Sequence, residues 1–193
     1  MAEIQKKAKR TVDTWKKKKW YIIEADPLFN NKEIGKTIAA DNKNLIDKKI
    51  TKSLEEITNN IKDSAYQITF KINKVTAGKA ETIIDNYNIK DSYLRRFVKR
   101  EKSKIEDILY LETKDEQKLK LKIIFISGAK YSTSLRAKAR NIMKEYFKNE
   151  IKEKTLQEAW NDIIFQKLSD KCKQKLIKLG YVNKIIIAKA KRM

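Results

Sequence analysis

Alternating apolar and polar residues dominate the chain from residue 20 to residue 127. The pattern is clearest in 66–72 and 118–127, where branched and aromatic residues occupy every second position. Such alternation is typical of strands that bury one face and leave the other in water. Polar turns separate the apolar segments. We therefore predict strands at 20–25, 34–40, 48–54, 66–72, 79–86, 105–113, 118–127 and 182–188.

The last third of the chain changes to helical periodicity. Apolar residues recur there every three or four positions, which predicts helices at 135–151, 155–168 and 169–179. Thr155 and Glu158 have the spacing of a capping box at the start of the second helix, and Gly180 is placed to end the third. One more helix is predicted between strands, at 91–103.

These elements predict an α+β fold: a small β-barrel-like sheet core with an inserted basic helix, C-terminal helices and basic terminal arms. The chain has 193 residues, of which 41% are hydrophobic, so it can bury a substantial core. We expect a basic N-terminal arm at 1–19 and a basic tail at 189–193. Between them we expect a single domain at 20–188, mainly β over 20–127 and mainly helical over 133–180, with a final strand at 182–188.

The net positive charge of the chain indicates what kind of partner it binds. The chain has 46 Lys and Arg against 25 Asp and Glu, a formal net charge of +21. A charge so large repels itself in a compact protein unless a polyanion neutralises it, and nucleic acid is the best-fitting partner. No apolar run is long enough to cross a membrane, and no apolar segment follows the basic start as in a secretory signal. The single cysteine, Cys172, is expected to be a small buried hydrophobe in a reducing, cytoplasmic setting.

Several chemistries are disfavoured. Without histidine and with one cysteine, the usual zinc sites and the commonest general base are missing, and we expect no metal, cofactor or enzymatic activity. Gly35-Lys36-Thr37 lacks the upstream glycine of a phosphate-binding loop and is better placed in a strand. A magnesium nuclease with Asp107, Glu112 and Lys114 is possible on paper. However, the three Glu-x-Lys matches in the chain equal the number expected by chance.

Basic residues concentrate in four places. The predicted helix at 91–103 carries an Arg-rich face, and the helix at 135–151 carries a stripe at four-residue spacing. Like charges at this spacing cost helix stability, which favours phosphate contact over a merely solvated surface. With the two terminal arms, the candidate RNA-binding residues are Lys6, Lys7, Lys9, Arg10, Trp15, Lys16, Lys17, Lys18, Lys19, Arg95, Arg96, Lys99, Arg100, Arg136, Arg140, Lys144, Lys148, Lys189, Lys191 and Arg192.

The aromatic residues allow two interpretations. Trp15 and Trp20 bracket a lysine run and could stack on bases or cap the edge of the domain; capping is favoured, more strongly for Trp20. The aromatic residues of the strands are expected mostly in the core. A sheet that stacks bases would instead carry them on the same face as its lysines.

The order of short motifs resembles the archaeal and eukaryotic small-subunit ribosomal protein family called e-S-one, formerly S-three-a. Residues 15–21 are similar to the family's Trp-Lys-x-Lys-x-Trp-Tyr opening, and 34–37 to its Ile-Gly-x-Thr. Residues 53–58 resemble its Ser-Leu-x-Asp-Leu-Thr segment, and 91–100 its Asp-Tyr-Leu-Arg-x-x-Val-Arg-Arg tract. The resemblance covers about 9–188. Without the long eukaryotic C-terminal extension, an archaeal-type member is favoured.

The resemblance implies a structural component of the small ribosomal subunit, bound to ribosomes in the cytoplasm. It further implies a place on the platform near the messenger exit, with contacts to the 3′ region of the small-subunit ribosomal RNA, to neighbouring platform proteins and, near the exit, to messenger RNA. The alternative hypothesis is a free-standing RNA chaperone or translation regulator that visits the ribosome transiently.

Overall fold

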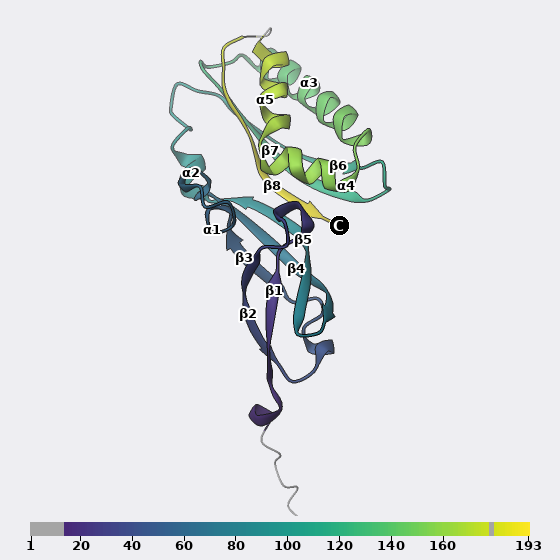
Figure 1. The fold of residues 1–193 in the computed structure, drawn as a ribbon. Coiled ribbons are helices and arrows are strands. Elements are labelled where there is room, and N and C mark those ends of the chain that lie inside the picture. Colours follow the sequence, from purple (N-terminus) through teal and green to yellow (C-terminus); the bar gives the residue numbers. More distant parts are fainter. Residues whose placement is uncertain (1–13, 178–179) are drawn as a thin grey trace, which may run out of the picture.

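The computed structural model describes residues 14–177 and 180–193 (Figure 1). The strands in these ranges are β1 (Lys19–Glu24), β2 (Glu33–Ala39), β3 (Lys49–Ser53), β4 (Tyr66–Thr76), β5 (Lys79–Ile89), β6 (Lys104–Glu112), β7 (Lys118–Ser127) and β8 (Val182–Arg192). The α-helices are α1 (Leu54–Thr58), α2 (Asp91–Arg95), α3 (Thr133–Lys152), α4 (Leu156–Ile164) and α5 (Lys167–Leu176). Four short 3₁₀ turns, the first at Thr14–Lys17, complete the described elements.

The strands form one branched sheet in which β5 is the junction. The order along the main path is β2-β1-β5-β8-β7-β6, and β4 pairs with both β3 and β5. The start of β5 runs parallel to β1, and its end pairs antiparallel with β8. The predicted α+β class is confirmed. Over the described residues the sheet is open rather than closed into a barrel, because β2, β3 and β6 each pair with one strand only and do not pair with one another. Helices α3–α5 cover one face of β6–β8 (Figure 1).

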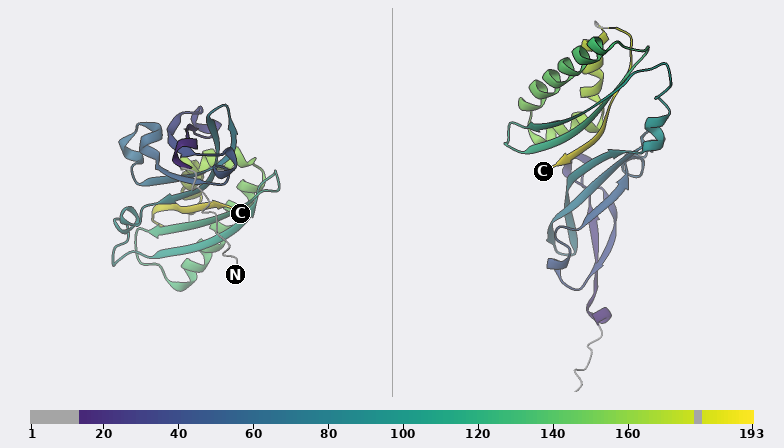
Figure 2. Two further views of the ribbon diagram at one scale, coloured as in Figure 1. Left: turned by 90° about the horizontal axis from the view of Figure 1, so that it is seen from below. Right: turned by 180° about the vertical axis from the view of Figure 1, so that it is seen from behind.

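The molecule is elongated, with β1–β5 at one end and β6–β8 with α3–α5 at the other (Figure 1). Both Figure 1 and the right-hand view of Figure 2 place α3–α5 on one side of β6–β8 and α2 on the other. The core follows one row of paired residues across the sheet: Leu121, Ala190, Tyr87 and Ile68 are in register and fully or almost fully buried. Burial of a large apolar side chain of this kind, such as Leu121 or Ile68, contributes roughly 1.5–3 kcal/mol to the free energy of unfolding.

The predicted capping box at the start of α4 is confirmed. The Thr155 hydroxyl accepts from the Glu158 N–H, and the Glu158 carboxylate accepts from the Thr155 N–H at 3.0 Å. The predicted helix 155–168 is wrong in its length, because Gln166 adopts a left-handed conformation with φ 60° and separates α4 from α5. The third predicted helix ends at Leu176, before Gly180; Gly180 has φ 154° and donates its N–H to the Ile177 carbonyl at 3.2 Å, while residues 178–179 lie outside the described residues.

Two basic segments differ from prediction. The helix expected at 91–103 ends at Arg95, and a turn continues to the start of β6. Arg95/Lys99 and Arg96/Arg100 would be like-charged pairs one helical turn apart, which opposes extension of the helix. The segment expected as a tail from residue 189 continues β8 through Arg192. There, buried Ala188 and Ala190 alternate with exposed lysines, so the residues keep the period of a half-buried strand.

Candidate nucleic-acid interface

The first candidate surface is the segment 95–100, here called the basic turn. Arg95, Arg96, Lys99 and Arg100 are all exposed on it. The turn is held at both ends: the Tyr93 and Phe97 rings pack edge to face at 5.1 Å, and the Ser103 N–H donates to the Ser127 hydroxyl at 2.8 Å. The structure therefore brings the four predicted cations together, but on an anchored turn and not along one helix face.

A lysine from β8 fixes the aromatic side of this turn. Lys184 Nζ donates to the Tyr93 hydroxyl at 2.8 Å and lies 4.5 Å from the centre of the Phe97 ring. Burial by itself would raise the pKa of Tyr93, but hydrogen bonds with Lys184 and Tyr66 outweigh it and hold that pKa below its ordinary value. Because Lys184 is engaged by these rings, the cations offered to a ligand here are those of the basic turn.

The second candidate surface is the α3 stripe, formed by Arg136, Arg140, Lys144 and Lys148. All four side chains are exposed, as predicted for one helix face. Three of them already have partners: Arg136 Nε donates to the Tyr131 carbonyl at 3.1 Å, and Arg140 Nε and Lys144 Nζ lie 3.9 and 3.2 Å from Asp107 Oδ2. The stripe is thus partly neutralised by a carboxylate from β6.

The third candidate surface is one face of the sheet, which the sequence analysis did not predict. Residues paired in register across antiparallel strands point to the same side of a sheet. One row of pairs runs Tyr110, Lys120, Lys191, Asn86, Thr69 and Thr51, and the next runs Ile108, Lys122, Lys189, Asn88, Gln67 and Ser53. These two rows, which none of the buried core residues enter, are called here the open sheet face.

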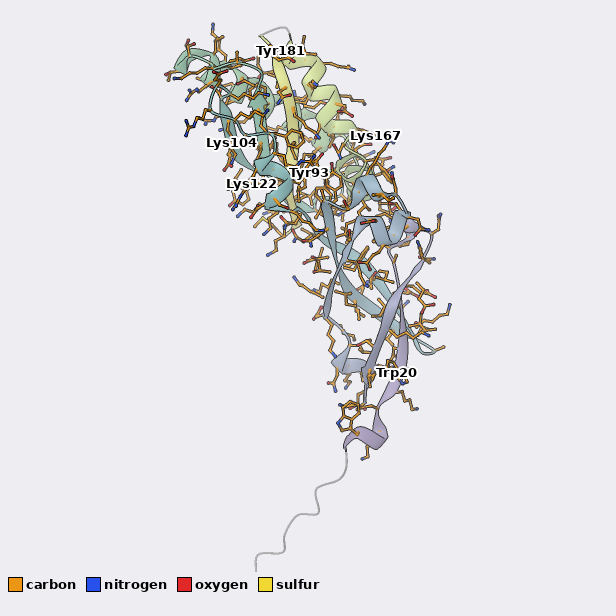
Figure 3. The ribbon with its side chains drawn as sticks, turned by 90° about the vertical axis from the view of Figure 1, so that its left-hand side faces the viewer. Trp20, Tyr93, Lys104, Lys122, Lys167 and Tyr181 are labelled. Carbon is orange, nitrogen blue, oxygen red and sulfur yellow. The ribbon has the colours of Figure 1, made fainter. Side chains whose placement is uncertain are left out.

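The open sheet face lies opposite the core row and so opposite α3–α5. Lys189 and Lys191, predicted as a tail contact, are exposed members of it. Lys122 and the neighbouring Lys104 both reach Glu106, with Lys122 Nζ 3.4 Å from Glu106 Oε2, and Figure 3 shows these two lysines close together. Arg192 is paired in register with buried Leu119, so it lies on the other face of the sheet, and its guanidinium donates to Gln117 Oε1 at 2.9 Å.

At the N-terminal end, β1 turns Tyr21 and Ile23 into the core, so Trp20 faces solvent and is 67% exposed (Figure 3). The preference for Trp20 as a cap of the core is wrong. Trp15 is also largely exposed, and Lys18 Nζ lies 3.7 Å from the centre of its ring. Exposed Lys17, Lys18 and Lys19 continue this patch. The side chain of Lys16 and the predicted contacts Lys6, Lys7, Lys9 and Arg10 lie outside the described residues.

The geometry does not favour a catalytic site at the residues considered for a nuclease. Asp107 faces Arg140 and Lys144, and Glu112 Oε1 lies 3.8 Å from Lys118 Nζ, so these carboxylates lie beside cations of their own chain. In the part of the chain that the structure describes, no three metal-ligating side chains come together. Burial raises the pKa of the Cys172 thiol to about 12, which makes it the inert core residue that the sequence predicted. No helix in the described ranges is long and apolar enough to span a membrane.

An α+β protein with exposed cations on several surfaces has the features of a protein that binds a polyanion. Comparison with known proteins is more specific. Residues 6–193 match the model of the Ribosomal S3Ae family, and the chain belongs to that family.

Relatives include proteins named small ribosomal subunit protein eS1. The one from Staphylothermus marinus is 33% identical over 179 residues, which cover 93% of this chain and 84% of the relative. Those from Methanothermobacter thermautotrophicus and Methanocaldococcus jannaschii are 27% and 28% identical, over 95% and 98% of this chain and 94% and 85% of their own length. The predicted archaeal-type membership is confirmed, and the family agrees with the expectation that the chain is not an enzyme.

Proposed function

We propose that this chain is a structural constituent of the small ribosomal subunit and binds its ribosomal RNA. The family and the names of the archaeal relatives support the ribosomal role. The observation that supports RNA contact is the placement of uncompensated cations: the basic turn gathers four exposed cations, and in the described residues none of the four lies in an ion pair. No reaction is part of this function.

Affinity comes from phosphate contacts. Each Lys or Arg that meets a phosphate releases counterions from the RNA, so binding weakens steeply as salt increases. Arginine adds geometry, because its planar fork can donate two hydrogen bonds to one phosphate. The basic turn holds Arg95, Arg96 and Arg100 on an anchored segment, so little conformational freedom is lost when they bind.

The finer location is also part of the proposal. We place the protein on the platform near the messenger exit, in contact with the 3′ region of the ribosomal RNA and with neighbouring platform proteins, in cytoplasmic ribosomes. The resemblance of residues 91–100 to the family tract supports this location. A protein–RNA crosslinking map of small subunits tests it: crosslinks from the basic turn should fall in the 3′ region, and crosslinks confined to another region would contradict it.

The direct test of RNA binding changes Arg95, Arg96, Lys99 and Arg100 together to Gln. Four lost phosphate contacts should flatten the slope of log affinity against log salt by about 3, from 0.7–0.9 per contact. A matched control changes four exposed lysines elsewhere, Lys43, Lys62, Lys167 and Lys171, and should have a smaller effect. An unchanged slope in the first variant would remove the basic turn from the RNA contact.

Sedimentation distinguishes this function from that of a transient RNA chaperone or regulator. A structural constituent should stay with small subunits in a sucrose gradient after a high-salt wash. Release of the protein into the top fractions would favour the transient visitor.

A further inference from the structure

The open sheet face places like charges directly opposite one another. Lys120 pairs in register with Lys191, and Lys122 with Lys189. Like charges at such cross-strand positions destabilise a sheet. In the described part of the chain, neither Lys189 nor Lys191 lies in an ion pair, and Glu106 is the one carboxylate within ion-pair distance of the four lysines. The face therefore has a cost in stability that a bound polyanion would remove.

An exposed aromatic ring borders this lysine array. Tyr110 is the partner of Lys120 across β6 and β7, is 63% exposed, and has Lys120 Nζ 5.2 Å from its ring centre. Ile108, the partner of Lys122, is 47% exposed beside it. An aromatic residue on the same face as the lysines is the arrangement in which a sheet stacks an unpaired base over its ring while lysines hold the phosphates.

The rest of the face is polar and neutral. Asn86 and Asn88 on β5 continue the two rows beyond the lysines, and Thr69 and Gln67 on β4 follow them. The amides of Asn88 and Gln67 can donate and accept hydrogen bonds without repelling an anion, whereas the Asn86 Oδ1 atom is buried and the Thr69 hydroxyl bonds to that of Thr51 at 3.0 Å. The bases of a duplex are stacked and paired and cannot reach a ring on a sheet surface, whereas an unpaired strand can.

We propose that an unpaired strand of the small subunit's own RNA lies across the open sheet face, with phosphates at Lys120, Lys122, Lys189 and Lys191 and a base stacked on Tyr110. The inference rests on the proposed ribosomal function and names the class of RNA that one surface takes. Four lysines against one carboxylate provide the charge complementarity. A permanent strand fits better than a passing messenger, because the repulsion between the paired lysines is present at all times.

Binding of a short RNA tests the surface. The probe is a fluorescein-labelled twelve-nucleotide strand of mixed A and U without secondary structure, titrated with the full chain by fluorescence anisotropy. Changing Lys120, Lys122, Lys189 and Lys191 to Gln should flatten the salt slope by about 3, since each contact on a single strand contributes about 0.7. The control with Lys43, Lys62, Lys167 and Lys171 changed to Gln removes the same charge elsewhere. Equal losses in both variants would overturn the proposal.

Tyr110 supplies the second readout. Tyr110→Ala should weaken binding of the same strand about tenfold, because it removes one stacked base. Tyr110→Phe keeps the ring and should bind as the wild type does. Unchanged affinity in Tyr110→Ala would contradict base stacking. The lysine variant is also titrated with polyglutamate. If it loses binding to polyglutamate but keeps binding to RNA, the partner of this face is an acidic protein and the proposal is overturned.

Stability without RNA checks that the lysine variant is folded and that the repulsion is real. The four Lys→Gln changes should raise its Tm above that of the wild type at low salt, because they remove two like-charged pairs. A lower Tm would contradict this account of the face.

A photo-crosslinking residue at position 110 identifies the source of the RNA. In small subunits washed free of messenger it should crosslink to ribosomal RNA; crosslinks only to messenger or only to protein would overturn the inference. If the wild-type chain binds no RNA of any kind, the proposed function fails. If it binds structured RNA through the basic turn while the open sheet face variants bind the short strand normally, only this inference fails.

Discussion

At the scale of single residues, Asp107 shows how a partner distant in the sequence changes the meaning of a charge pattern. Within α3 the stripe has only like-charged neighbours at four-residue spacing, which favours phosphate contact over a merely solvated surface. The structure brings Asp107 from β6 beside Arg140 and Lys144, so two of the four have an acidic partner. No local pattern contains this contact, because it depends on how α3 packs on β6.

Asp107→Asn tests the role of that carboxylate. Loss of its contacts with two half-exposed cations should lower the free energy of unfolding by less than about 1 kcal/mol. RNA affinity should rise, because Arg140 and Lys144 lose a competing anion. Urea titration and RNA titration measure the two effects. Glu33→Gln, which breaks the exposed pair with Lys36, is the control and should not raise affinity as much.

At the scale of elements, local signals predicted well where they do not depend on distant partners. The capping box at Thr155 and the strand at 118–127 are confirmed, because periodicity and caps are properties of neighbouring residues. The helix predicted at 91–103 is shorter than its apolar spacing indicates, because repulsion among its cations opposes the helix beyond Arg95. The last strand extends beyond the predicted 182–188 to Arg192, because Lys189 and Lys191 alternate with Ala188 and Ala190 in the period of a half-buried strand. A basic composition alone therefore does not distinguish a tail from a strand.

Removal of the α4 cap gives a measurable cost. Thr155→Ala loses the hydroxyl that accepts from the Glu158 N–H and should destabilise the protein by about 1 kcal/mol. Thr133→Ala, at an exposed first-turn position of α3 where Ser132 is the cap, is the matched control. A urea titration should show a lower midpoint with an unchanged m-value for Thr155→Ala alone. Equal midpoints for the two variants would argue against the capping role.

The ion pairs at the junction of α3 and α4 should make the stability of the protein depend on pH in the acid range. Lys154 Nζ donates to Glu150 at 3.0 Å and to Asp162 at 2.7 Å, and the first bond is the main reason why the pKa of Glu150 lies below its ordinary value of 4.5. A lowered carboxyl pKa stabilises the folded state above pH 4.5, and this stabilisation is lost as pH falls through the folded pKa. Lys154→Met should therefore flatten the decline of Tm below about pH 4.5. A decline as steep as in the wild type would contradict this contribution.

At the scale of the whole molecule, the net charge of +21 pointed to a polyanion, and the motif order pointed to the family that the comparisons then showed. The sequence alone did not predict which cations lie together on one surface. The open sheet face exists because strand register aligns β6, β7, β8 and β5, and only the alternation of Lys118, Lys120 and Lys122 hinted at it. Cations that looked scattered along the chain are thus gathered on the basic turn, the α3 stripe and the open sheet face.

The most direct test of the account is the affinity of the folded, monomeric full chain for small-subunit ribosomal RNA across a series of KCl concentrations. If the surplus cations serve to bind phosphates, affinity should be high at moderate ionic strength. It should fall along a straight line in a plot of log affinity against log salt, with a slope of several units. A folded monomer with no measurable affinity for this RNA, or with an affinity that does not change with salt, would contradict the account.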